Sequence, residues 1–567
     1  MPSEPTLLTE KNCHQNGWWL LILLTALLYL PGTQTIPLMD RDEPRFANAT
    51  VEMMQRGTWT VPYFNGQYRF DKPPLTYWWM RLHYHLLGVS ELAARLHGVV
   101  AVFLTALLIS GLAKRVTGSS RTGVIAGLLW LTTTQVLIHG RLCVADMPMI
   151  LCVSLACRAL LELVVMQNAK PQALWWWTLW LALGFGFLAK GPIAWLIPAV
   201  TLLVWRFALW RKPTSWQHLH FMPGIVVMLA PVAVWGIPAL IETRGLFWDI
   251  GMGRHVVQRG MEVLNGRKFI PGYYLLSTWF SLFPWLFFIG PVYRMLRANK
   301  SATSAFLAAW FLAAQVVFFF YATQLPHYVM PGYPAFIVLL AVAWRKQPTV
   351  PKLAVWGTSI ISALILVVCI AVWLLPIPSP ELQALARSTA SLLAALFILG
   401  GLASTFAWRG RGLWRWLLPL LAIAATVSCL VPFSQNLRRT SVTLQLSEHL
   451  QSLPADARFL SSGYDEPSLV FYTQRRWETG VNMNIVHEQL ALSNPCAVVL
   501  LRREWTLDHW IKSLAGGQNA LGLSAKDRSA EVDALRNQHP DLEYHLVEGF
   551  NGARSSWTES VLLLRRR

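Results

Sequence analysis

Charged residues are scarce in this chain: only 14% of its 567 residues are Asp, Glu, Lys or Arg, whereas 54% are hydrophobic. A soluble multidomain protein is excluded, because apolar windows of about 20 residues recur along the sequence and that length spans the hydrocarbon core of a bilayer. The sequence therefore predicts a polytopic membrane protein.

The chain also lacks any cysteine spacing typical of a metal site or a redox pair. Its seven cysteines include no CxxC pair, and most lie in or beside apolar segments. We interpret them as small buried hydrophobic residues.

Acidic residues are outnumbered, and the formal net charge is +19. A basic excess can indicate nucleic-acid binding, but much of this charge lies in short loops between apolar segments, which is the pattern of membrane topology signals. Nucleic acid is therefore not expected as a partner. Anionic lipid headgroups and an anionic substrate are the two partners that the charge favours.

About thirteen membrane-spanning helices are expected from the lengths of the apolar windows and their charged ends, because periodicity gives no information inside all-apolar segments. The expected spans are 17–37, 93–114, 122–140, 147–166, 173–190, 192–209, 222–241, 272–293, 303–321, 328–344, 353–375, 385–408 and 413–433. Alternate connections are short and basic, so we expect them and the N-terminus to face the cytoplasm. An odd number of spans then places the C-terminal segment on the opposite side.

Two connections on that opposite side are long. Residues 38–92 contain amphipathic pieces that are predicted to lie on the membrane surface. Residues 242–271 are rich in basic residues, including His255 and Arg259. Such charge on this side breaks the topology rule locally, and two explanations stay open: contact with lipid headgroups, or a lid over a phosphate-bearing substrate.

After Phe433 the composition becomes mixed polar and apolar. Residues 1–433 are therefore predicted to form the membrane domain, and residues 434–567 a small α/β domain with an accessory role on the periplasmic side. A segment of about 130 residues is long enough to bury its own core. The expected β-like runs are 458–460, 469–472, 497–501 and 561–564.

Five polar groups fall on the non-cytoplasmic side once this topology is imposed. Three of them have an ordinary explanation: Asp146 before Met-Pro is typical of a helix N-cap, Asp42 could cap a surface helix, and adjacent Asp71 and Lys72 suit a solvated ion pair. Their convergence on one side favours a functional site instead. The groups are Asp42-Glu43-Pro44-Arg45, Asp71-Lys72, Asp146, Lys190, and His327-Tyr328 with the nearby Gln324.

These residue types suit transfer of a group from an anionic lipid carrier. Lys and Arg bind phosphate, and a carboxylate can act as general base toward an acceptor hydroxyl or stabilise positive charge on a sugar ring. Paired carboxylates can also attract a divalent metal. No His lies at fixed helical spacing beside Asp42, Glu43 or Asp146, so we expect no strict metal requirement and no other cofactor.

The order of several motifs carries a resemblance to a known family. DEPRF follows the first span, and DKPPLTYW, ADMP, LAKGP and LPHYVMPGYPA come after it. This series resembles the bacterial relatives of the dolichyl-phosphate-mannose protein mannosyltransferases. Within that group it is similar to the lipid A aminoarabinose transferases, glycosyltransferase family 83, of the polytopic GT-C fold. The resemblance covers nearly the whole chain, including thirteen spans and a periplasmic C-terminal domain.

The resemblance implies roles for the acidic residues. Asp42 would be the leading catalytic carboxylate, with Glu43 and Arg45 as its companions. Asp146 would be the second carboxylate of the site. Asp71 stands where the aminoarabinose transferases usually have Glu.

The resemblance also implies a set of phosphate contacts. Lys72, Lys190 and Tyr328 match family residues expected near the carrier phosphate. His255 and Arg259 resemble an H-x-x-R-F loop, but the spacing here is HVVQR with no Phe after it, which leaves their roles open. Gln324 replaces a common Lys, so a basic contact is either missing or supplied by His327.

The resulting hypothesis is a glycosyltransferase of the bacterial inner membrane. It would move a sugar from an undecaprenyl-phosphate-type carrier to an extracytoplasmic acceptor, which the resemblance implies is lipid A or lipopolysaccharide. One alternative is an enzyme like the protein O-mannosyltransferases, with a Ser or Thr acceptor. The others are a transporter or flippase for lipid-linked sugars, which would favour midplane charges and paired repeats, and a structural assembly protein.

Overall fold

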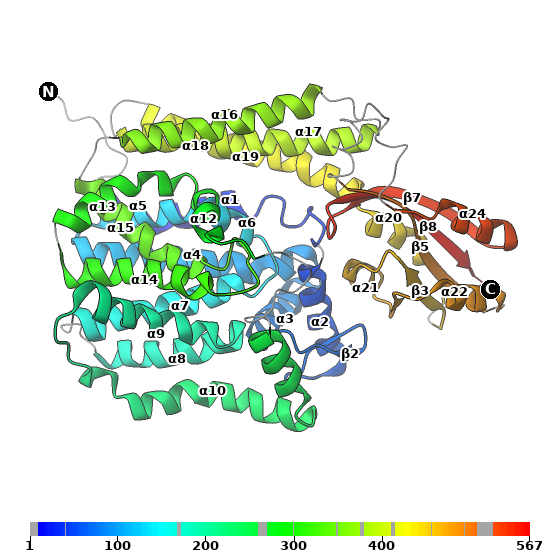
Figure 1. The fold of residues 1–567 in the computed structure, drawn as a ribbon, viewed down its shortest axis with the longest axis horizontal. Coiled ribbons are helices and arrows are strands. Elements are labelled where there is room, and N and C mark those ends of the chain that lie inside the picture. Colours follow the sequence, from blue (N-terminus) through cyan, green and yellow to red (C-terminus); the bar gives the residue numbers. More distant parts are fainter. Residues whose placement is uncertain are drawn as a thin grey trace.

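The structure is a computed structural model of the full chain. It describes residues 10–39, 41–166, 172–258, 269–298, 300–346, 350–374, 379–409, 414–454, 456–492, 494–506 and 526–566. Within these ranges the molecule is a bundle of long helices with a small sheet at one end (Figure 1).

Eight helices of the described residues are long and apolar enough to cross a membrane, and a bent pair would make nine. The protein is thus a multi-pass membrane protein. The eight are α4 (Glu91–Thr117), α7 with η1 (Asp146–Met166), α9 with η2 (Ile193–Trp210), η3 with α10 (Gln217–Glu242), α14 (Ala302–Phe319), α16 (Lys352–Leu374), α17 with η8 and α18 (Pro380–Trp408), and Leu417–Arg439 of α19 (Trp414–Arg439). The bent pair is α12 (Tyr273–Ser281) with η6 and α13 (Trp285–Ala298), at 100°.

The count of thirteen spans stays a prediction, because the remaining expected spans form helices that are short or rich in Trp. These are α1 (Glu10–Tyr29), α5 (Ser120–Leu131) with α6 (Thr134–His139), α8 (Gln172–Lys190), and η7 (Met330–Gly332) with α15 (Tyr333–Lys346). The Asn16–Tyr29 part of α1 is apolar but shorter than a full span. The expected span 122–140 is interrupted between α5 and α6.

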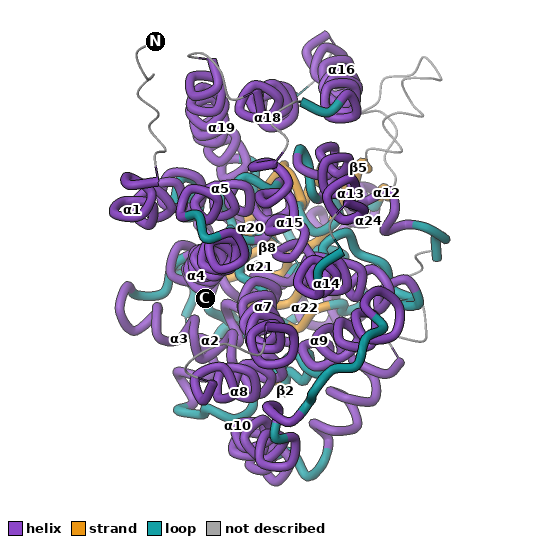
Figure 2. Tube along the Cα trace, turned by 90° about the vertical axis from the view of Figure 1, so that its left-hand side faces the viewer, coloured by secondary structure: helices purple, strands orange, loops and turns teal. Residues whose placement is uncertain are grey.

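The helices pack in layers. Helices α4, α5, α7, α14 and α15 form the centre, α8 to α10 lie on one side, and α16 to α19 lie on the other (Figures 1 and 2). Small residues allow the closest approaches: a Cβ on Gly184 of α8 would lie 2.6 Å from the Met228 carbonyl oxygen of α10. Such contacts are typical of membrane bundles, where packing rather than the hydrophobic effect holds helices together.

The first long loop folds into α2 (Asp42–Arg56), a hairpin of β1 (Tyr63–Phe64) and β2 (Gln67–Tyr68), and α3 (Leu75–Leu87). Acidic residues in the first turn of α2 and Arg56 in its last turn complement the helix dipole, and Gly57 ends the helix with φ 69°. The hairpin turns at Asn65 and Gly66, both with positive φ.

The C-terminal segment contains a six-stranded mixed sheet in the order β4-β3-β5-β8-β7, with β6 paired to β5. Its central strands β5 (Cys496–Thr506) and β8 (Ser556–Arg565) are antiparallel, and β3 (Arg458–Ser462) is parallel to β5. The shorter strands are β4 (Glu478–Thr479), β6 (Lys526–Asp527) and β7 (Glu543–Asn551), and the helices are α20 (Val442–Leu450), α21 (Pro467–Thr473), α22 (Met483–Ala491) and α24 (Ser529–Gln538).

Three of the four expected β-runs in this segment are strands, and the fourth is wrong. Residues 469–472 lie in α21, because Pro467 stands in its first turn, where a missing N–H costs nothing. Helix α19 continues past Phe433 to Arg439, so the predicted domain boundary falls inside a helix.

The sheet module is joined to the first loop by paired hydrogen bonds. The Asn65 side chain donates to the Trp477 carbonyl at 2.7 Å and accepts from the Trp477 N–H at 2.9 Å. The Glu52 carboxylate accepts from the Asn65 N–H at 2.6 Å and so holds the hairpin turn in place. At a second contact, the Tyr472 hydroxyl of α21 accepts from the Leu38 N–H of the first loop at 2.8 Å.

Replacing Asn65 with Gly should loosen this junction. Glycine keeps the positive φ but loses both hydrogen bonds to Trp477, which should lower the free energy of unfolding by about 1–3 kcal/mol. Thermal unfolding in detergent measures the loss. Asn65→Asp keeps one of the two hydrogen bonds, so its stability should lie between those of the wild-type protein and Asn65→Gly. Wild-type stability in Asn65→Gly would contradict the assignment.

Candidate active site

Two of the predicted site residues, Asp146 and Lys190, form an ion pair. Asp146 begins α7 and Lys190 ends α8, and the two helix ends lie side by side. The Lys190 ammonium donates to Asp146 Oδ1 at 2.6 Å. The pair also complements the dipoles of both helices, with an anion at an N-terminus and a cation at a C-terminus. The N-cap explanation for Asp146 is wrong, since Ala145 occupies that position.

A pair of histidines lies behind this ion pair. His327 Nε2 is 3.8 Å from Asp146 Oδ1, and its ring is 4.4 Å from that of His139. His139 is buried and is held by Gln135, whose amide nitrogen lies 2.8 Å from its Nδ1. His139 was missed from the sequence because 122–140 was predicted as one continuous span. The polar QxxxH spacing of Gln135 and His139 was the available signal.

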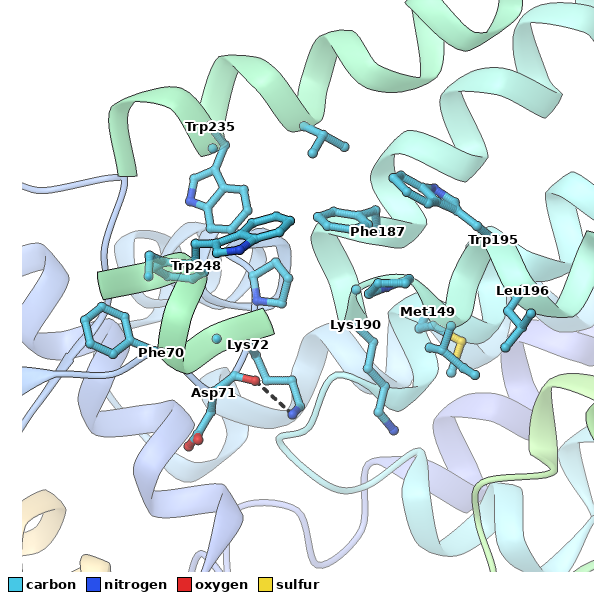
Figure 3. Close-up of a pocket in the computed structure, with 18 of the residues that line it drawn as sticks. Phe70, Asp71, Lys72, Met149, Phe187, Lys190, Trp195, Leu196, Trp235 and Trp248 are labelled. Carbon is cyan, nitrogen blue, oxygen red and sulfur yellow. Dashed lines mark hydrogen bonds between the residues drawn. The ribbon is translucent and has the colours of Figure 1, made fainter. Parts of the chain in front are cut away.

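A cavity of about 640 Å³ opens beside the ion pair. Asp71, Lys72 and Lys190 line one part of it, and its remaining wall is mostly aromatic and aliphatic. Figure 3 shows the two lysine side chains extending in a similar direction, away from the group formed by Phe187, Trp195, Trp235 and Trp248. The cavity is therefore amphipathic, with a cationic end and an apolar wall.

Tyr328 connects the ion pair to this cavity. The Lys190 ammonium lies 5.3 Å from the centre of the Tyr328 ring, within cation–π range. The Lys72 ammonium donates to the Asp71 carbonyl at 2.9 Å. Lys72, Lys190 and Tyr328, predicted as a group of phosphate contacts, thus line one cavity.

A second cavity of about 700 Å³ lies among α1, α5, α18 and α19. Among the described residues that line it, Arg121 is the only charged one. Cationic groups do not converge there, so the first cavity is the candidate site.

The adjacent residues Asp42 and Glu43 have different environments. Asp42 is exposed at the first position of α2, whereas Glu43 is buried against Arg95 of α4 at 2.8 Å. Arg45, two residues after Glu43 in the same helix, is half-buried. Only Asp42 of the two carboxylates is open to a substrate.

Arg69 ties the loop residues Asp71 and Tyr77 together. It forms an ion pair with Asp71 at 3.0 Å and donates to the Tyr77 hydroxyl at 3.0 Å. Burial disfavours the charged form of Arg69, but Tyr77, Asp71 and Asp42 outweigh it, so the pKa of the guanidinium lies above its ordinary value. Arg69 therefore remains a cation near both Asp42 and Asp71.

The remaining predicted contacts, the His255 side chain and Arg259, lie outside the described residues. The described part of their loop, η4 (Phe247–Gln258), places Phe247 and Trp248 in the wall of the cavity. Among the described residues, no three His, Cys, Asp or Glu side chains are grouped to hold a metal ion.

The sequence is similar to those of known membrane transferases. Residues 71–236 match the family described as dolichyl-phosphate-mannose-protein mannosyltransferase. The undecaprenyl phosphate-alpha-4-amino-4-deoxy-L-arabinose arabinosyl transferase of Pseudomonas paraeruginosa is 26% identical over 475 residues, which is 81% of this chain and 84% of that protein. The enzyme of that name from Pectobacterium carotovorum is 31% identical over 59% of this chain and 60% of its own length.

The fold matches as well. The structure of ArnT from Cupriavidus metallidurans bound to undecaprenyl phosphate superposes with a TM-score of 0.73 at 20% identity, over 97% of this chain and 98% of that one. The chain is similar to the aminoarabinose transferases in sequence and in fold. The resemblance predicted from the motifs is confirmed, and the helical bundle has the fold of these transferases.

Breaking the Asp146–Lys190 ion pair should destabilise the protein. Lys190→Met leaves the Asp146 carboxylate buried without its cation, which should cost about 3–5 kcal/mol. The double variant Lys190→Met with Asp146→Asn should regain part of that loss, because no uncompensated charge remains. Thermal unfolding checks both variants, and a double variant less stable than the single one would contradict the pairing.

Proposed function

We propose that the protein transfers a sugar from a polyprenyl-phosphate carrier to an acceptor outside the cytoplasm, at the bacterial inner membrane. The observation that carries this proposal is the amphipathic cavity, in which Lys72 and Lys190 stand at one end of an apolar wall. Lysine ammonium groups bind phosphate, and apolar walls accept hydrocarbon. The names of the relatives, which are arabinosyl transferases using undecaprenyl phosphate, support the same donor class.

The lysines and Tyr328 are assigned to the carrier phosphate. Asp146 orients Lys190, and His327 lies close enough to add a further donor at the same end. His255 and Arg259 are assigned to the phosphate on the family resemblance alone, and η4 acts as the lid over the cavity. No metal is assigned to the site.

The proposed reaction is a displacement at the sugar carbon. The bond from that carbon to the carrier phosphate oxygen breaks, the acceptor oxygen forms the new bond with inversion, and the electron pair stays on the phosphate. The cationic end of the cavity stabilises the charge that develops on this leaving group. Asp42 is exposed, so it can orient the donor or take the proton of an acceptor hydroxyl. A phosphate acceptor is already ionised and needs no base.

Lipid A is the acceptor that we assign, following the resemblance to the aminoarabinose transferases. A protein Ser or Thr is the second candidate, because the matching family is described as a protein mannosyltransferase family.

The proposed orientation of the protein in the membrane has two supports: the basic residues of the short connections, and the contact between Asn65 and Trp477. The basic short connections support thirteen spans with a cytoplasmic N-terminus. The hydrogen bonds between Asn65 and Trp477 support a periplasmic sheet module, because they join it to the loop that carries Asp42.

A direct assay tests the function. Purified protein is reconstituted in liposomes with labelled undecaprenyl-phosphate-linked sugar, and release of the carrier phosphate is measured with and without lipid A. Transfer supports the enzyme, whereas movement of intact donor across the bilayer without bond cleavage would favour a transporter. Mass spectrometry of lipid A and of periplasmic proteins, with and without the gene, separates the two acceptors.

Asp42→Asn should abolish transfer while leaving donor binding and folding intact. The amide keeps the size of the side chain but removes the charge and the capacity to accept a proton. Turnover in the liposome assay, donor affinity and thermal unfolding are the three measurements. Wild-type turnover in this variant would remove Asp42 from the catalytic role.

Lys72→Met should weaken donor binding by about 10- to 100-fold, because one charge-assisted hydrogen bond is worth about 1.5–3 kcal/mol. The control is Lys212→Met, which removes an exposed ammonium from another connection and should leave the donor affinity unchanged. Undecaprenyl phosphate titration, followed by thermal shift, gives both affinities. Equal affinity in the two variants would argue against Lys72 as a phosphate contact.

A further inference from the structure

Arg95 forms a complete set of hydrogen bonds inside the molecule. Its Nε and Nη2 donate to the two oxygens of Glu43, each at 2.8 Å. Its remaining N–H groups donate to the carbonyls of Thr33, Ile36 and Pro37 at 2.7–2.8 Å. A guanidinium has five N–H donors, and all five are used here.

The Glu43 carboxylate is equally saturated. Oε1 accepts from Arg95 and from the Cys143 N–H at 2.7 Å, and Oε2 accepts from Arg95 and from the Met39 N–H at 2.8 Å. A carboxylate offers about four lone-pair sites, so none is left for a substrate. The side chain is also 2% exposed, so Glu43 does not reach the cavity.

These bonds join the two segments that carry the proposed site carboxylates. Glu43 lies next to Asp42 in the first turn of α2. Cys143 lies in the turn that leads into α7, which begins at Asp146. Arg95 belongs to α4, and its hydrogen bonds to the Thr33 and Pro37 carbonyls also hold the segment that precedes α2. One buried ion pair thus fixes the start of α2 relative to the start of α7.

We propose that Arg95 and Glu43 are positioning residues for the transfer reaction: they hold Asp42 and Asp146 at a fixed separation without contacting the substrate. This inference rests on the proposed function. A buried ion pair seldom adds much net stability, because desolvation offsets the attraction. Instead, the pair holds Asp42 and Asp146 in one relative position. A displacement of about 1 Å at a reacting centre can lower the rate by about 100-fold.

The chain offers a matched control at the far ends of the same helices. Glu162 of η1, which continues α7, is 1% exposed and pairs with Arg115 of α4 at 3.3 Å and with Arg158 at 3.5 Å. Glu162, like Glu43, is a buried carboxylate paired with arginine, but its ion-pair partners among the described residues are Arg115 and Arg158, neither of which is a proposed site residue. Glu162→Gln therefore reports the general cost of weakening a buried ion pair.

The test is a double-mutant cycle read as kcat, donor KM and thermal stability. Glu43→Gln and Arg95→Met should each lower kcat about 100-fold and change donor KM by less than about threefold. The reason is that Asp42 shifts relative to Asp146, whereas Lys190 keeps its bond to Asp146 and so keeps its place in the cavity. The double variant should be no slower than the slower single variant, because each single substitution already breaks the same ion pair. Glu162→Gln should lose comparable thermal stability while its kcat stays within about twofold of wild type.

Each outcome decides the proposal. If Glu43→Gln turns over like Glu162→Gln, or if the two single losses multiply in the double variant, the positioning role is overturned and the proposed function stands. Absence of turnover in the wild-type protein would overturn both. If Arg95→Met does not fold, Arg95→Lys replaces it: lysine keeps the charge but lacks the planar fork, so kcat should fall about tenfold, and a wild-type kcat would overturn the proposal.

Discussion

A charge withdrawn from water must be matched by an opposite charge, and this constraint shapes the interior of the protein. Three buried carboxylates of the helical bundle, Glu43, Asp146 and Glu162, each form an ion pair with a cation from another segment. Every such pair joins elements that are distant in the sequence. The pairs therefore determine which helix ends meet, whereas the apolar helix faces alone would permit several arrangements.

The Asp146–Lys190 pair also sets the character of the cavity. Its carboxylate offsets one of the two lysine charges, so the cationic end carries less net charge than Lys72 and Lys190 would alone. The phosphate leaving group of the proposed reaction must be stabilised during bond breaking and then released, and a partly compensated charge would serve both needs. The apolar wall supplies binding that does not depend on the reacting bond.

The sequence predicted the helical membrane protein and the charged residues that line the cavity, Asp71, Lys72 and Lys190, because charges at span ends are rare and visible. Apart from Tyr328, it did not predict the aromatic and aliphatic residues of the cavity wall. It did not separate Asp42 from Glu43, since both lie in one motif, and it missed Arg95 and His139. Those two residues stand inside predicted spans, where only the fold shows which distant carboxylate or ring they meet. The span count stayed open because interrupted and Trp-rich helices fall below the length and hydropathy of a full span.

Helix geometry explains why two adjacent carboxylates, Asp42 and Glu43, have different environments. Successive residues of an α-helix point about 100° apart, so they do not share a face. At the first turn of α2 this rotation directs Glu43 into the core, toward Arg95, and leaves Asp42 exposed. The order of the two residues is therefore constrained: exchanging them would place a shorter side chain opposite Arg95 and the longer one at the surface. Of the two acidic residues in this motif, Glu43 is therefore part of the packed interior, and Asp42 is the one that remains exposed.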